Sequence, residues 1–383
     1  MRYAAVKETS NKAQPIGVAH GGDIECVAAQ FGIATDDLLD FSANINPLGP
    51  PSSVLRRLAR EAGDAHQLMR YPDIELRELR SAISAATGIE ELSVVIANGA
   101  AALIDAAVRA VKQQTAARCL LPVPSFSEYR RALDGAGYTT VQLPLDAERD
   151  FRIDTEALAE TIAHERPRLC IVANPHNPSG SALPRDAIEQ LLRAANSAGT
   201  FILLDEAFID YLPAESLTSV AAKTENLIVL RSLTKFYGMP ALRVGYAVAT
   251  PKVSSAMHAQ IPSWPVTTLA AGAALEALRD TDYAVHTRKA NVDERSLLAL
   301  ALTKMKLRVF PSAANFLLVE LPQNAPPVGN LRARLIQEHQ IIVRDCSSYE
   351  GLTGGRYLRV AVRSRADNER LIAALSVVLT SGE

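Results

Sequence analysis

The sequence predicts an α/β protein in which a mainly parallel sheet of seven strands is sandwiched by helices and followed by a smaller α+β C-terminal domain. Seven short apolar runs lie between residues 94 and 248, and most are separated by stretches long enough for a helix. Such runs are typical of strands that are buried on both faces and joined by helical crossovers. The pattern changes after Trp264, where a long helical region begins, so the 383 residues are expected to form two domains.

The expected boundaries follow from these patterns. Residues 1–44 are predicted to form an N-terminal arm that joins the small domain, residues 45–265 the large domain, and residues 266–383 the small C-terminal domain. The predicted strands of the large domain are residues 94–97, 119–123, 140–145, 169–173, 201–204, 227–230 and 244–248. A helix capped by Asp73 is expected over residues 74–87. In the small domain we expect helices over 266–302, 331–339 and from 366, and strands at 307–310, 314–320, 341–344 and 357–362.

The arm contains one short predicted helix, residues 24–31, capped by Asp23 and ended by Gly32. This helix places the turn His20-Gly21-Gly22 at its N-terminus, where free backbone N–H groups and the helix dipole favour an anion. A plain glycine turn is the alternative interpretation of the same residues.

Composition excludes several classes of function. With 48% hydrophobic and 21% charged residues and a net charge of -2, the protein has no global field to attract nucleic acid or an acidic membrane. No run approaches the roughly 18 apolar residues that a membrane span needs, and residues 1–14 lack the apolar core of a signal peptide. The four cysteines stand far apart, which favours a reduced, cytoplasmic protein without a metal site. Function is therefore expected to depend on a local site.

Ligands of such sheets bind beyond the carboxyl ends of the strands, so the residues directly after each run are the candidates. Asp205 follows one run and can hold the N–H of a pyridinium ring, although a helix cap or a metal-binding acid would look the same. Asn177 lies in a loop stiffened by two prolines and can donate to a phenolate oxygen, although a simple turn is equally possible.

Other strand ends supply further contacts. Gly99, Ala100 and Ala101 open a helix whose N–H groups suit a phosphate, and Phe126 can stack on an aromatic ring. After the run at 227–230 come Ser232, Thr234, Lys235 and Arg243, and a lysine in this place can attack an aldehyde. Asn177, Asp205 and Lys235 are separated by 28 and 30 residues, each about one strand-helix unit. Together these residues supply the contacts that pyridoxal phosphate requires.

Three segments resemble the signature motifs of the fold type I, class I/II pyridoxal-phosphate aminotransferases. They are Asn174-Pro-His-Asn-Pro-Ser-Gly180, Asp205-Glu-Ala-Phe208, and Ser232-Leu-Thr-Lys-Phe236 with the Leu-Arg-Val-Gly245 that follows. The resemblance implies Lys235 as the lysine bonded to the cofactor, Asp205 at its ring nitrogen, Asn177 at its ring oxygen and Phe126 stacked on it. It also implies that the cofactor phosphate is held by Ser232, Arg243 and the amides of Ala100 and Ala101. Gly99 and Thr234 are further expected cofactor-binding residues.

The same resemblance implies two further roles. Tyr71 matches a tyrosine that reaches the cofactor phosphate of a neighbouring subunit, so a homodimer with shared sites is expected. Arg359 matches the arginine that binds the α-carboxylate of the substrate.

Within this superfamily the sequence is most similar to the threonine-phosphate decarboxylases of cobalamin biosynthesis, which are related to the histidinol-phosphate aminotransferases. The similar segments are His20-Gly-Gly-Asp23, Asp40-Phe-Ser-Ala-Asn-Ile-Asn-Pro-Leu-Gly-Pro50, Val343-Arg-Asp-Cys-Ser-Ser-Tyr349 and Arg359-Val-Ala-Val-Arg363. This similarity implies that the substrate phosphate is held by the turn His20-Gly21-Gly22 with Asn44 and Arg344. Asn177 and Arg359 would hold the remainder of the substrate.

The expected reaction is the decarboxylation of L-threonine O-3-phosphate to (R)-1-aminopropan-2-yl phosphate. The alternatives are a histidinol-phosphate-type aminotransferase, a decarboxylase of O-phosphoserine, and a catalytically idle sensor, against which the intact Lys235 and Asp205 argue. The chain departs from the family pattern at four positions. Phe208 stands where a tyrosine is common, and Asp23 where an asparagine is expected. Ala101 and Ala102 stand where a hydroxyl and an acid, respectively, are common.

Overall fold

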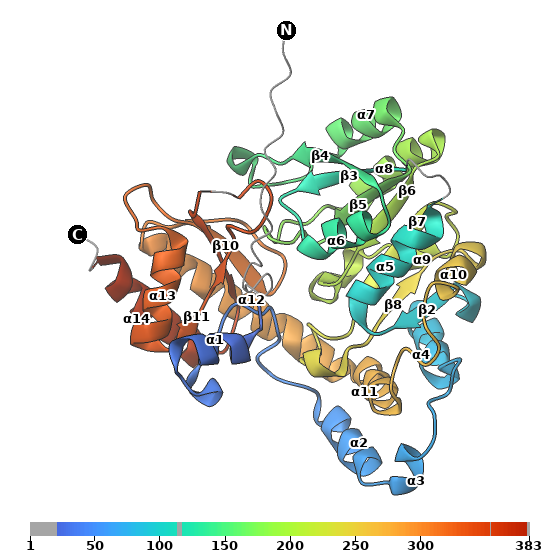
Figure 1. Ribbon diagram of the computed structural model, residues 1–383, viewed down its shortest axis with the longest axis horizontal. Helices are drawn as coiled ribbons and strands as arrows, with labels where there is room; N and C mark the ends of the chain where they lie inside the picture. The colour runs from blue at the N-terminus through green and yellow to red at the C-terminus, as the bar shows by residue number, and fades with distance from the viewer. Residues whose placement is uncertain (1–20, 113–116, 353, 381–383) are drawn as a thin grey trace, which may run out of the picture.

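The computed structural model describes residues 21–112, 117–352 and 354–380. Its largest element is a seven-stranded sheet with the strand order β2-β8-β7-β6-β5-β3-β4 (Figure 1). The strands are β2 (Val94–Ala97), β3 (Arg118–Val123), β4 (Thr139–Pro144), β5 (Leu169–Ala173), β6 (Phe201–Asp205), β7 (Leu227–Ser232) and β8 (Gly245–Val248). Only β8 runs antiparallel to its neighbours, so the predicted mainly parallel α/β sheet is confirmed.

Both faces of this sheet are buried, which explains why its strands are apolar without alternation. In β2, Val94 and Ile96 belong to one core layer, whereas Val95 and Ala97 belong to the other. One face is covered by α5 (Gly99–Val111), α6 (Ser127–Gly135) and α10 (Pro251–His258). The other is covered by α4 (Arg77–Thr87), α7 (Thr155–Glu165), α8 (Arg185–Ala198) and α11 (Thr268–Arg279). Successive side chains of a strand point to opposite faces of the sheet. Because helices cover both faces, the side chains on each face must be apolar.

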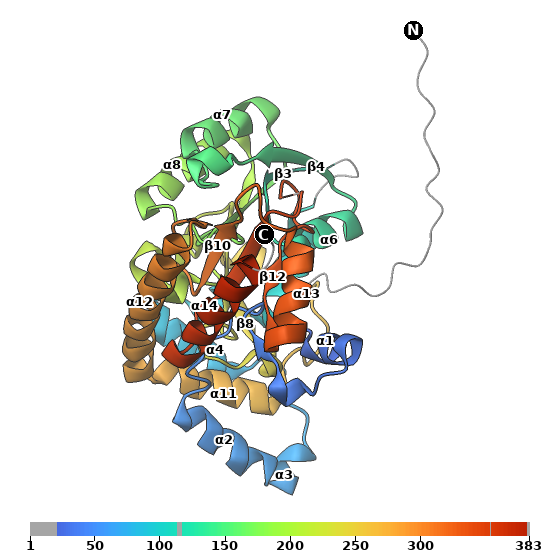
Figure 2. The ribbon, with the colours of Figure 1, turned by 90° about the vertical axis from the view of Figure 1, so that its left-hand side faces the viewer.

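A second sheet of four strands has the order β12-β13-β10-β9. Its strands are β9 (Arg308–Val309), β10 (Phe316–Glu320), β12 (Arg344–Asp345) and β13 (Tyr357–Ala361). The helices α13 (Val328–His339) and α14 (Arg365–Thr380) lie side by side against it (Figure 2). The long helix α12 (Thr281–Lys304) joins the two parts, because Tyr283 packs on the large core and Leu298 on the small one.

The N-terminal arm packs on the small sheet's side of the molecule. Helix α1 (Ile24–Phe31) begins and ends as expected, with the Asp23 carboxylate accepting from the Cys26 N–H and Gly32 in the left-handed conformation. Strand β1 (Leu39–Asp40) pairs in parallel with β11 (Ile341–Ile342). The arm is thereby fixed to a segment near the far end of the chain. The remaining helices are α2 (Ser52–Ala62), α3 (Ala65–Leu68) and α9 (Thr218–Ala221).

Several predicted elements were wrong in their bounds. The helix expected from residue 74 begins at Arg77, because Leu76 takes a left-handed conformation with φ of 48°. Asp73 still accepts hydrogen bonds from the N–H groups of Glu75 and Arg77, at 3.2 and 3.0 Å. The run 341–344 is not one strand, since β11 and β12 belong to different sheets.

The helical region expected over 266–302 is divided into α11 and α12 at Asp280, whose carboxylate caps α12. The domain boundary near residue 266 stays a prediction. Residues such as Ala270 and Ala274 of α11, just beyond it, are buried in the core of the large sheet.

Candidate active site

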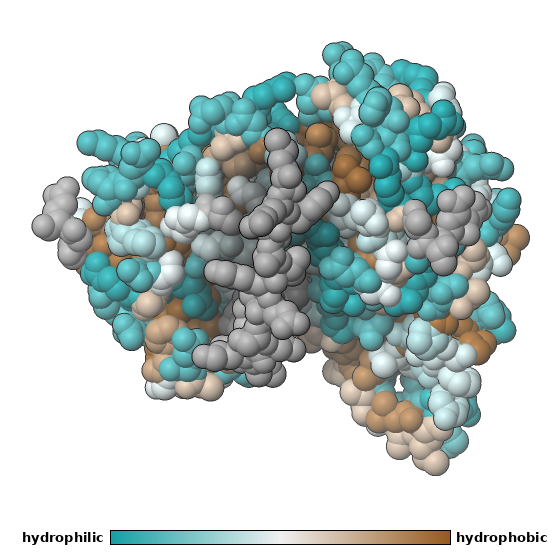
Figure 3. Space-filling model, turned by 45° about the horizontal axis from the view of Figure 1, so that its top comes forward, coloured by the Kyte–Doolittle hydropathy of each residue, from teal (hydrophilic) through white to brown (hydrophobic). Residues whose placement is uncertain are grey.

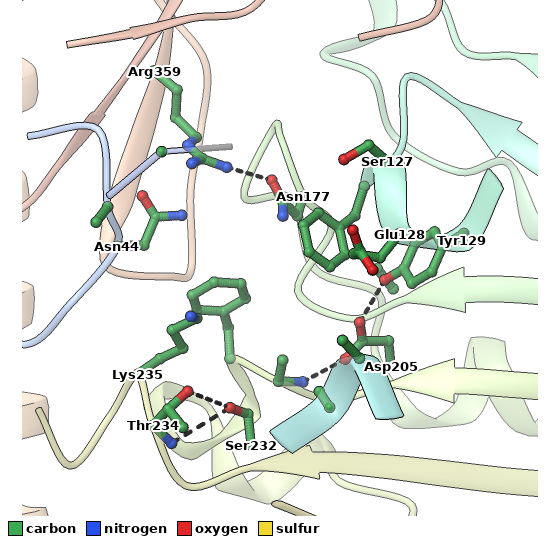
Figure 4. Close-up of a pocket in the computed structure, with 18 of the residues that line it drawn as sticks. Asn44, Ser127, Glu128, Tyr129, Asn177, Asp205, Ser232, Thr234, Lys235 and Arg359 are labelled. Atoms are coloured by element: carbon green, nitrogen blue, oxygen red, sulfur yellow. Dashed lines mark hydrogen bonds between the residues drawn. The ribbon is translucent and has the colours of Figure 1, made fainter. Parts of the chain in front are cut away.

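A cavity of about 440 Å³ lies at the carboxyl ends of the large sheet, where the arm and the four-stranded sheet approach it. Figure 4 shows Lys235 and Asn44 across this cavity from Tyr129 and Asp205, with Arg359 and Asn177 above. The strand ends, the arm and the C-terminal part of the chain all contribute to its lining. The predicted residues that line it are Gly21, Asn44, Ala100, Ala101, Phe126, Asn177, Asp205, Ser232, Thr234, Lys235, Arg243, Arg344 and Arg359.

Lys235 follows β7 in a turn and its side chain extends into the cavity (Figure 4). Burial lowers the pKa of its ammonium to about 8, and the positive charges of Arg243 and Arg359 act in the same direction. The Asp205 carboxylate opposes this shift. A lysine with this pKa has about one amine in ten neutral at pH 7, far more than an ordinary lysine. The side chain is therefore a competent nucleophile toward an aldehyde and a competent proton carrier.

Asp205 ends β6 and is 6% exposed. Its Oδ1 accepts from the Ala207 N–H at 2.9 Å, and its Oδ2 accepts from the Tyr129 hydroxyl at 2.5 Å. Burial raises the pKa of Asp205, while these two hydrogen bonds and the charge of Lys235 oppose the rise. Burial also raises the pKa of Tyr129 well above its usual value, so Tyr129 is a neutral donor. The carboxylate is thus held in one orientation, with its anionic form stabilised.

Sequence reasoning missed Tyr129, although it lies three residues after Phe126 in the same segment. Phe126 precedes α6 and Tyr129 lies in its first turn, where the two rings meet edge to face at 5.7 Å. The position of Tyr129 one turn into a helix after a strand end was the signal available.

One corner of the cavity has the groups that bind phosphate. Gly99 opens α5 with φ of 78°, and an added Cβ there would lie 2.7 Å from Nη2 of Arg243. A side chain at this position would push the guanidinium away from the helix N-terminus, and the positive φ also favours glycine. Nearby, the hydroxyls of Ser232 and Thr234 are 2.8 Å apart and both are buried. A helix N-terminus, an arginine and two hydroxyls are a chemically suitable set for a phosphate group.

The loop that carries Asn177 is fixed to the loop before Phe126 by a second unpredicted residue, His176. Its Nε2 donates to the Pro124 carbonyl at 2.9 Å and its Nδ1 accepts from Ser179 Oγ at 2.7 Å. Burial lowers the pKa of His176 to about 4, so it is neutral and keeps this donor and acceptor pattern. The two loops that face the predicted ring position are consequently held together.

Arg359 is buried and is held by neutral acceptors. Nη1 donates to Asn177 Oδ1 at 2.6 Å and to the Tyr349 hydroxyl at 3.0 Å, and Nη2 donates to the Ser42 carbonyl at 3.1 Å. Within the described residues Arg359 forms no ion pair with a carboxylate. Tyr349, which also stacks on the Arg344 guanidinium at 5.5 Å, was not predicted from the sequence.

Arg344 and Arg359 are direct cross-strand partners in the antiparallel pair β12–β13. Both are buried, at 6% and 5% exposure, and both line the cavity. Like charges directly opposite each other destabilise a sheet. Both guanidinium groups line the same cavity, so they make it attractive to an anionic ligand.

The arm reaches the cavity through Gly21, Ser42 and Asn44. A Cβ at Gly21 would lie 2.1 Å from the Ser42 carbonyl oxygen, and the Gly22 N–H donates to Ser42 Oγ at 3.0 Å. Asn44 is buried, and its Oδ1 accepts no hydrogen bond from the described part of the chain. This orphaned oxygen indicates a donor on a ligand. His20 lies outside the described residues.

The departures from the family pattern have clear positions. Asp23 caps α1, and its carboxylate accepts a hydrogen bond from the Cys26 N–H at the start of that helix. Phe208 lines the cavity and packs edge to face on Phe316. Ala102 is not among the residues that line the cavity.

Tyr71 is not brought to the cavity of its own chain. Its side chain is 80% exposed and stacks on Trp264, with ring centroids 4.6 Å apart. Figure 3 shows apolar residues at the lower right, over the lobe that α2 and α3 form. The exposed apolar residues of this region are Leu55, Leu68, Met69, Ile74 and Trp264.

Among residues 21–112, 117–352 and 354–380, no group of His, Cys, Asp and Glu side chains has the arrangement of a metal site. No helix in the same part of the chain is long and apolar enough to cross a membrane.

Residues 36–375 match the protein family described as Aminotransferase class I and II. The chain is 36% identical over 365 residues to the threonine-phosphate decarboxylase of Salmonella typhimurium, which covers 94% of this chain and 97% of that protein. It is 28% identical over 362 residues to the histidinol-phosphate aminotransferase of Methanococcus aeolicus, covering 94% of this chain and 95% of that protein.

A solved structure agrees in fold over almost all of both chains. The histidinol-phosphate aminotransferase of Sinorhizobium meliloti, in complex with pyridoxal-5'-phosphate, has a TM-score of 0.85 and 25% identity, covering 99% of each chain. The family match covers residues 36–375, and the similarity to the Salmonella enzyme extends over 94% of this chain. The protein therefore belongs to the aminotransferase class I and II family.

Proposed function

We propose that the cavity binds pyridoxal 5'-phosphate. The donor set fits this cofactor: Lys235 for its aldehyde, Asp205 for its ring nitrogen, and the corner of Gly99, Ser232 and Arg243 for its phosphate. Asn177 and Phe126 supply an amide donor and an aromatic face for the ring. The Sinorhizobium relative, solved with this cofactor, supports the same assignment.

When bound, pyridoxal phosphate supplies an electron sink for the pair of electrons released at the substrate's α-carbon. The chain's own residues prepare the site for this chemistry. The hydrogen bonds from Tyr129 and Ala207 favour the anionic form of Asp205, which is the form that would stabilise a protonated ring nitrogen. Lys235 Nζ, with a pKa of about 8, both attacks an aldehyde and carries a proton near neutral pH.

The substrate that we propose is L-threonine O-3-phosphate, which is decarboxylated to (R)-1-aminopropan-2-yl phosphate and CO2 in cobalamin biosynthesis. The observation that carries this proposal is the cross-strand pair of buried arginines, Arg344 and Arg359. A substrate with a phosphate and a carboxylate provides one anion for each. The 36% identity to the Salmonella threonine-phosphate decarboxylase supports this choice. The orphaned Oδ1 of Asn44 suits an N–H donor, such as the amine of the substrate.

A second candidate is histidinol-phosphate-type amino transfer. The Methanococcus relative favours it, and its substrate, histidinol phosphate, also carries a phosphate. Histidinol phosphate has no α-carboxylate, so in amino transfer the partner of the buried Arg359 would be the carboxylate of the keto-acid acceptor instead. O-phosphoserine, which carries both anions, is the closer competitor.

Product analysis separates these functions. The purified protein is loaded with pyridoxal phosphate and incubated with O-phosphothreonine, O-phosphoserine or histidinol phosphate, and CO2 and keto product are measured with and without a keto-acid acceptor. Release of CO2 from O-phosphothreonine without an acceptor is the expected result. Keto product from histidinol phosphate that depends on an acceptor would replace the proposal with the second candidate.

We also propose that the protein is a homodimer in which Tyr71 reaches the cofactor phosphate of the partner subunit. The exposed aromatic pair of Tyr71 and Trp264 and the apolar residues on α3 support this assignment, because isolated aromatic side chains are rarely this exposed. Sedimentation should give twice the chain mass of 41.2 kDa. Tyr71→Phe should keep the dimer but weaken cofactor binding several-fold, and a monomeric, fully active protein would contradict the proposal.

A cytoplasmic location is part of the same proposal. All four cysteines are free, which suits a reducing compartment.

A further inference from the structure

The segment between β1 and α2, residues 42–49, runs from the small sheet to the lysine turn, and we call it the strap. Just before it, the Phe41 N–H donates to the Ile342 carbonyl at 2.8 Å and the Phe41 carbonyl accepts from Ala361 at 2.9 Å. At its first residue, the Ser42 carbonyl accepts from Nη2 of Arg359 at 3.1 Å. The upstream end of the strap is thereby fixed to the arginine that we assign to the substrate carboxylate.

The downstream end is fixed to the turn that carries Lys235. The Asn46 N–H donates to the carbonyl of Lys235 itself at 3.1 Å, and Asn46 Nδ2 donates to the Phe236 carbonyl at 2.8 Å. A Cβ on Gly238 would lie 2.7 Å from the carbonyl carbon of Gly49, so the turn and the strap touch backbone to backbone. Three contacts therefore join two segments that lie about half the chain apart.

Asn46 is also anchored to helix α12. Its Nδ2 lies 2.8 Å from the Tyr283 hydroxyl and 3.2 Å from Thr287 Oγ1, and its Oδ1 accepts from the Leu48 N–H at 3.1 Å. The Tyr283 hydroxyl in turn donates to the Gly49 carbonyl at 2.5 Å. Asn46 is 5% exposed and does not line the cavity. It cannot touch a ligand there, so any effect on chemistry must pass through the residues that it holds.

We propose that Asn46 is a positioning residue, and that the strap fixes the Lys235 turn relative to Arg359 so that the amine and the bound carboxylate keep one spacing. The carbonyls of Lys235 and Phe236 accept from the backbone N–H and the side-chain amide of the same buried residue, Asn46, which leaves the turn little freedom. The inference rests on the proposed function for the role of Arg359. Its structural claim concerns only how Lys235 is held.

The test measures the titration of the Lys235 amine in the full-length protein without added cofactor. Trinitrobenzenesulfonate labels neutral amines, and peptide mass spectrometry reports the rate at Lys235 as a function of pH. The wild-type midpoint is expected near pH 8, because burial is the main cause of the lowered pKa. Asn46→Ala should loosen the turn, admit water, and move the midpoint upward by about one pH unit toward that of an ordinary lysine.

The matched control is Asn226→Ala. Asn226 Nδ2 also donates to a backbone carbonyl, that of Thr200 at 2.8 Å, but it lies at the opposite end of β7. It should leave the midpoint unchanged even if thermal stability falls. Equal shifts in both variants would show that Asn46 contributes only to the general stability of the fold, and would overturn the proposal.

A second pair of variants tests the proposal if Asn46→Ala does not fold. Gly238→Ala and Gly199→Ala both place alanine at positive φ, 61° and 71°, but only the first adds a collision, with Gly49. Gly238→Ala should raise the midpoint and Gly199→Ala should not. Unchanged midpoints in every strap variant that folds would overturn the inference.

The same proteins are then mixed with pyridoxal phosphate and the visible absorbance band of the bound cofactor is recorded. If the wild type forms no band, the proposed function fails while the labelling result still decides the role of the strap. If the band forms, the strap variants should form it about tenfold more slowly than the wild type.

Discussion

The two halves of the cavity are built differently. The half assigned to the cofactor consists of residues at strand ends and at one helix N-terminus of a single sheet, such as Asp205 and Gly99. The half assigned to the substrate comes from segments at opposite ends of the chain, such as Asn44 and Arg344. A rigid sheet suits a group that every turnover reuses, whereas an assembly of arm and small sheet can vary with the substrate without disturbing the first half.

The largest expected effect tests the cofactor half. Lys235→Ala removes the nucleophile and proton carrier, so we expect no visible band with pyridoxal phosphate and a loss of turnover of at least about 10³-fold. Absorbance spectra and CO2 release measure the two losses. Lys252→Ala, an exposed lysine on α10, is the control and should behave as the wild type. Turnover that persists in Lys235→Ala would remove this residue from the chemistry.

An intermediate effect tests the substrate half alone. Arg344→Gln should lower kcat/KM for O-phosphothreonine about 10²-fold, which is about 2.7 kcal/mol. The reason is that the buried phosphate of the substrate loses its arginine partner. Cofactor affinity should not change. Activity on unphosphorylated threonine, however small, should fall much less.

Arg356→Gln is the control for this variant, since Arg356 lies in the same region of the chain but pairs with Glu320 outside the cavity. Arg359→Gln should lower activity on both substrates by similar factors. Equal losses on both substrates for Arg344→Gln would instead place Arg344 outside the phosphate site.

The smallest expected effect concerns Tyr129. Its hydrogen bond lowers the pKa of Asp205, so Tyr129→Phe should raise that pKa further. The anionic form is present above the pKa and is lost as the pH falls through it. The acid limb of the kcat/KM profile should therefore move to higher pH, with about a tenfold loss on the acid side, because one hydrogen bond to a charged group is worth about 1.5 kcal/mol.

Tyr138→Phe provides the comparison, since the Tyr138 hydroxyl donates to the Val108 carbonyl at 3.1 Å within the same core layer. It should leave the acid limb in place. If the limb does not move in Tyr129→Phe either, Tyr129 does not tune Asp205.

The difference between the halves also explains what the sequence could predict. Apolar runs mark strand ends directly, so Asp205, Asn177 and Lys235 could be located from local patterns, and the structure places them around one cavity. Among the substrate residues, only the turn at Gly21 and Gly22 had a local signal, because it precedes a helix, whereas Asn44, Arg344 and Arg359 were indicated only by a resemblance to known enzymes.

Contacts between distant segments were not predictable from local sequence. Tyr129 meets Asp205 across 76 residues, and Asn46 meets Phe236 across 190. Nothing in the sequence around Asn46 indicates a partner, because the segment has neither an apolar run nor a helical pattern. Local errors had local causes: α4 starts late because Leu76 adopts a left-handed conformation that its sequence does not announce.

The reversed direction of β8 has a consequence for the lysine turn. Because β8 runs antiparallel to β7, Ser232 and Gly245 are direct partners, and the chain between them is a closed hairpin. Lys235 and Arg243 both lie within this loop, and Arg243 reaches the carboxyl edge of the sheet only because the next strand leads away from it. The spacing between the Lys235 amine and the Arg243 guanidinium is thus set within one hairpin of the large sheet.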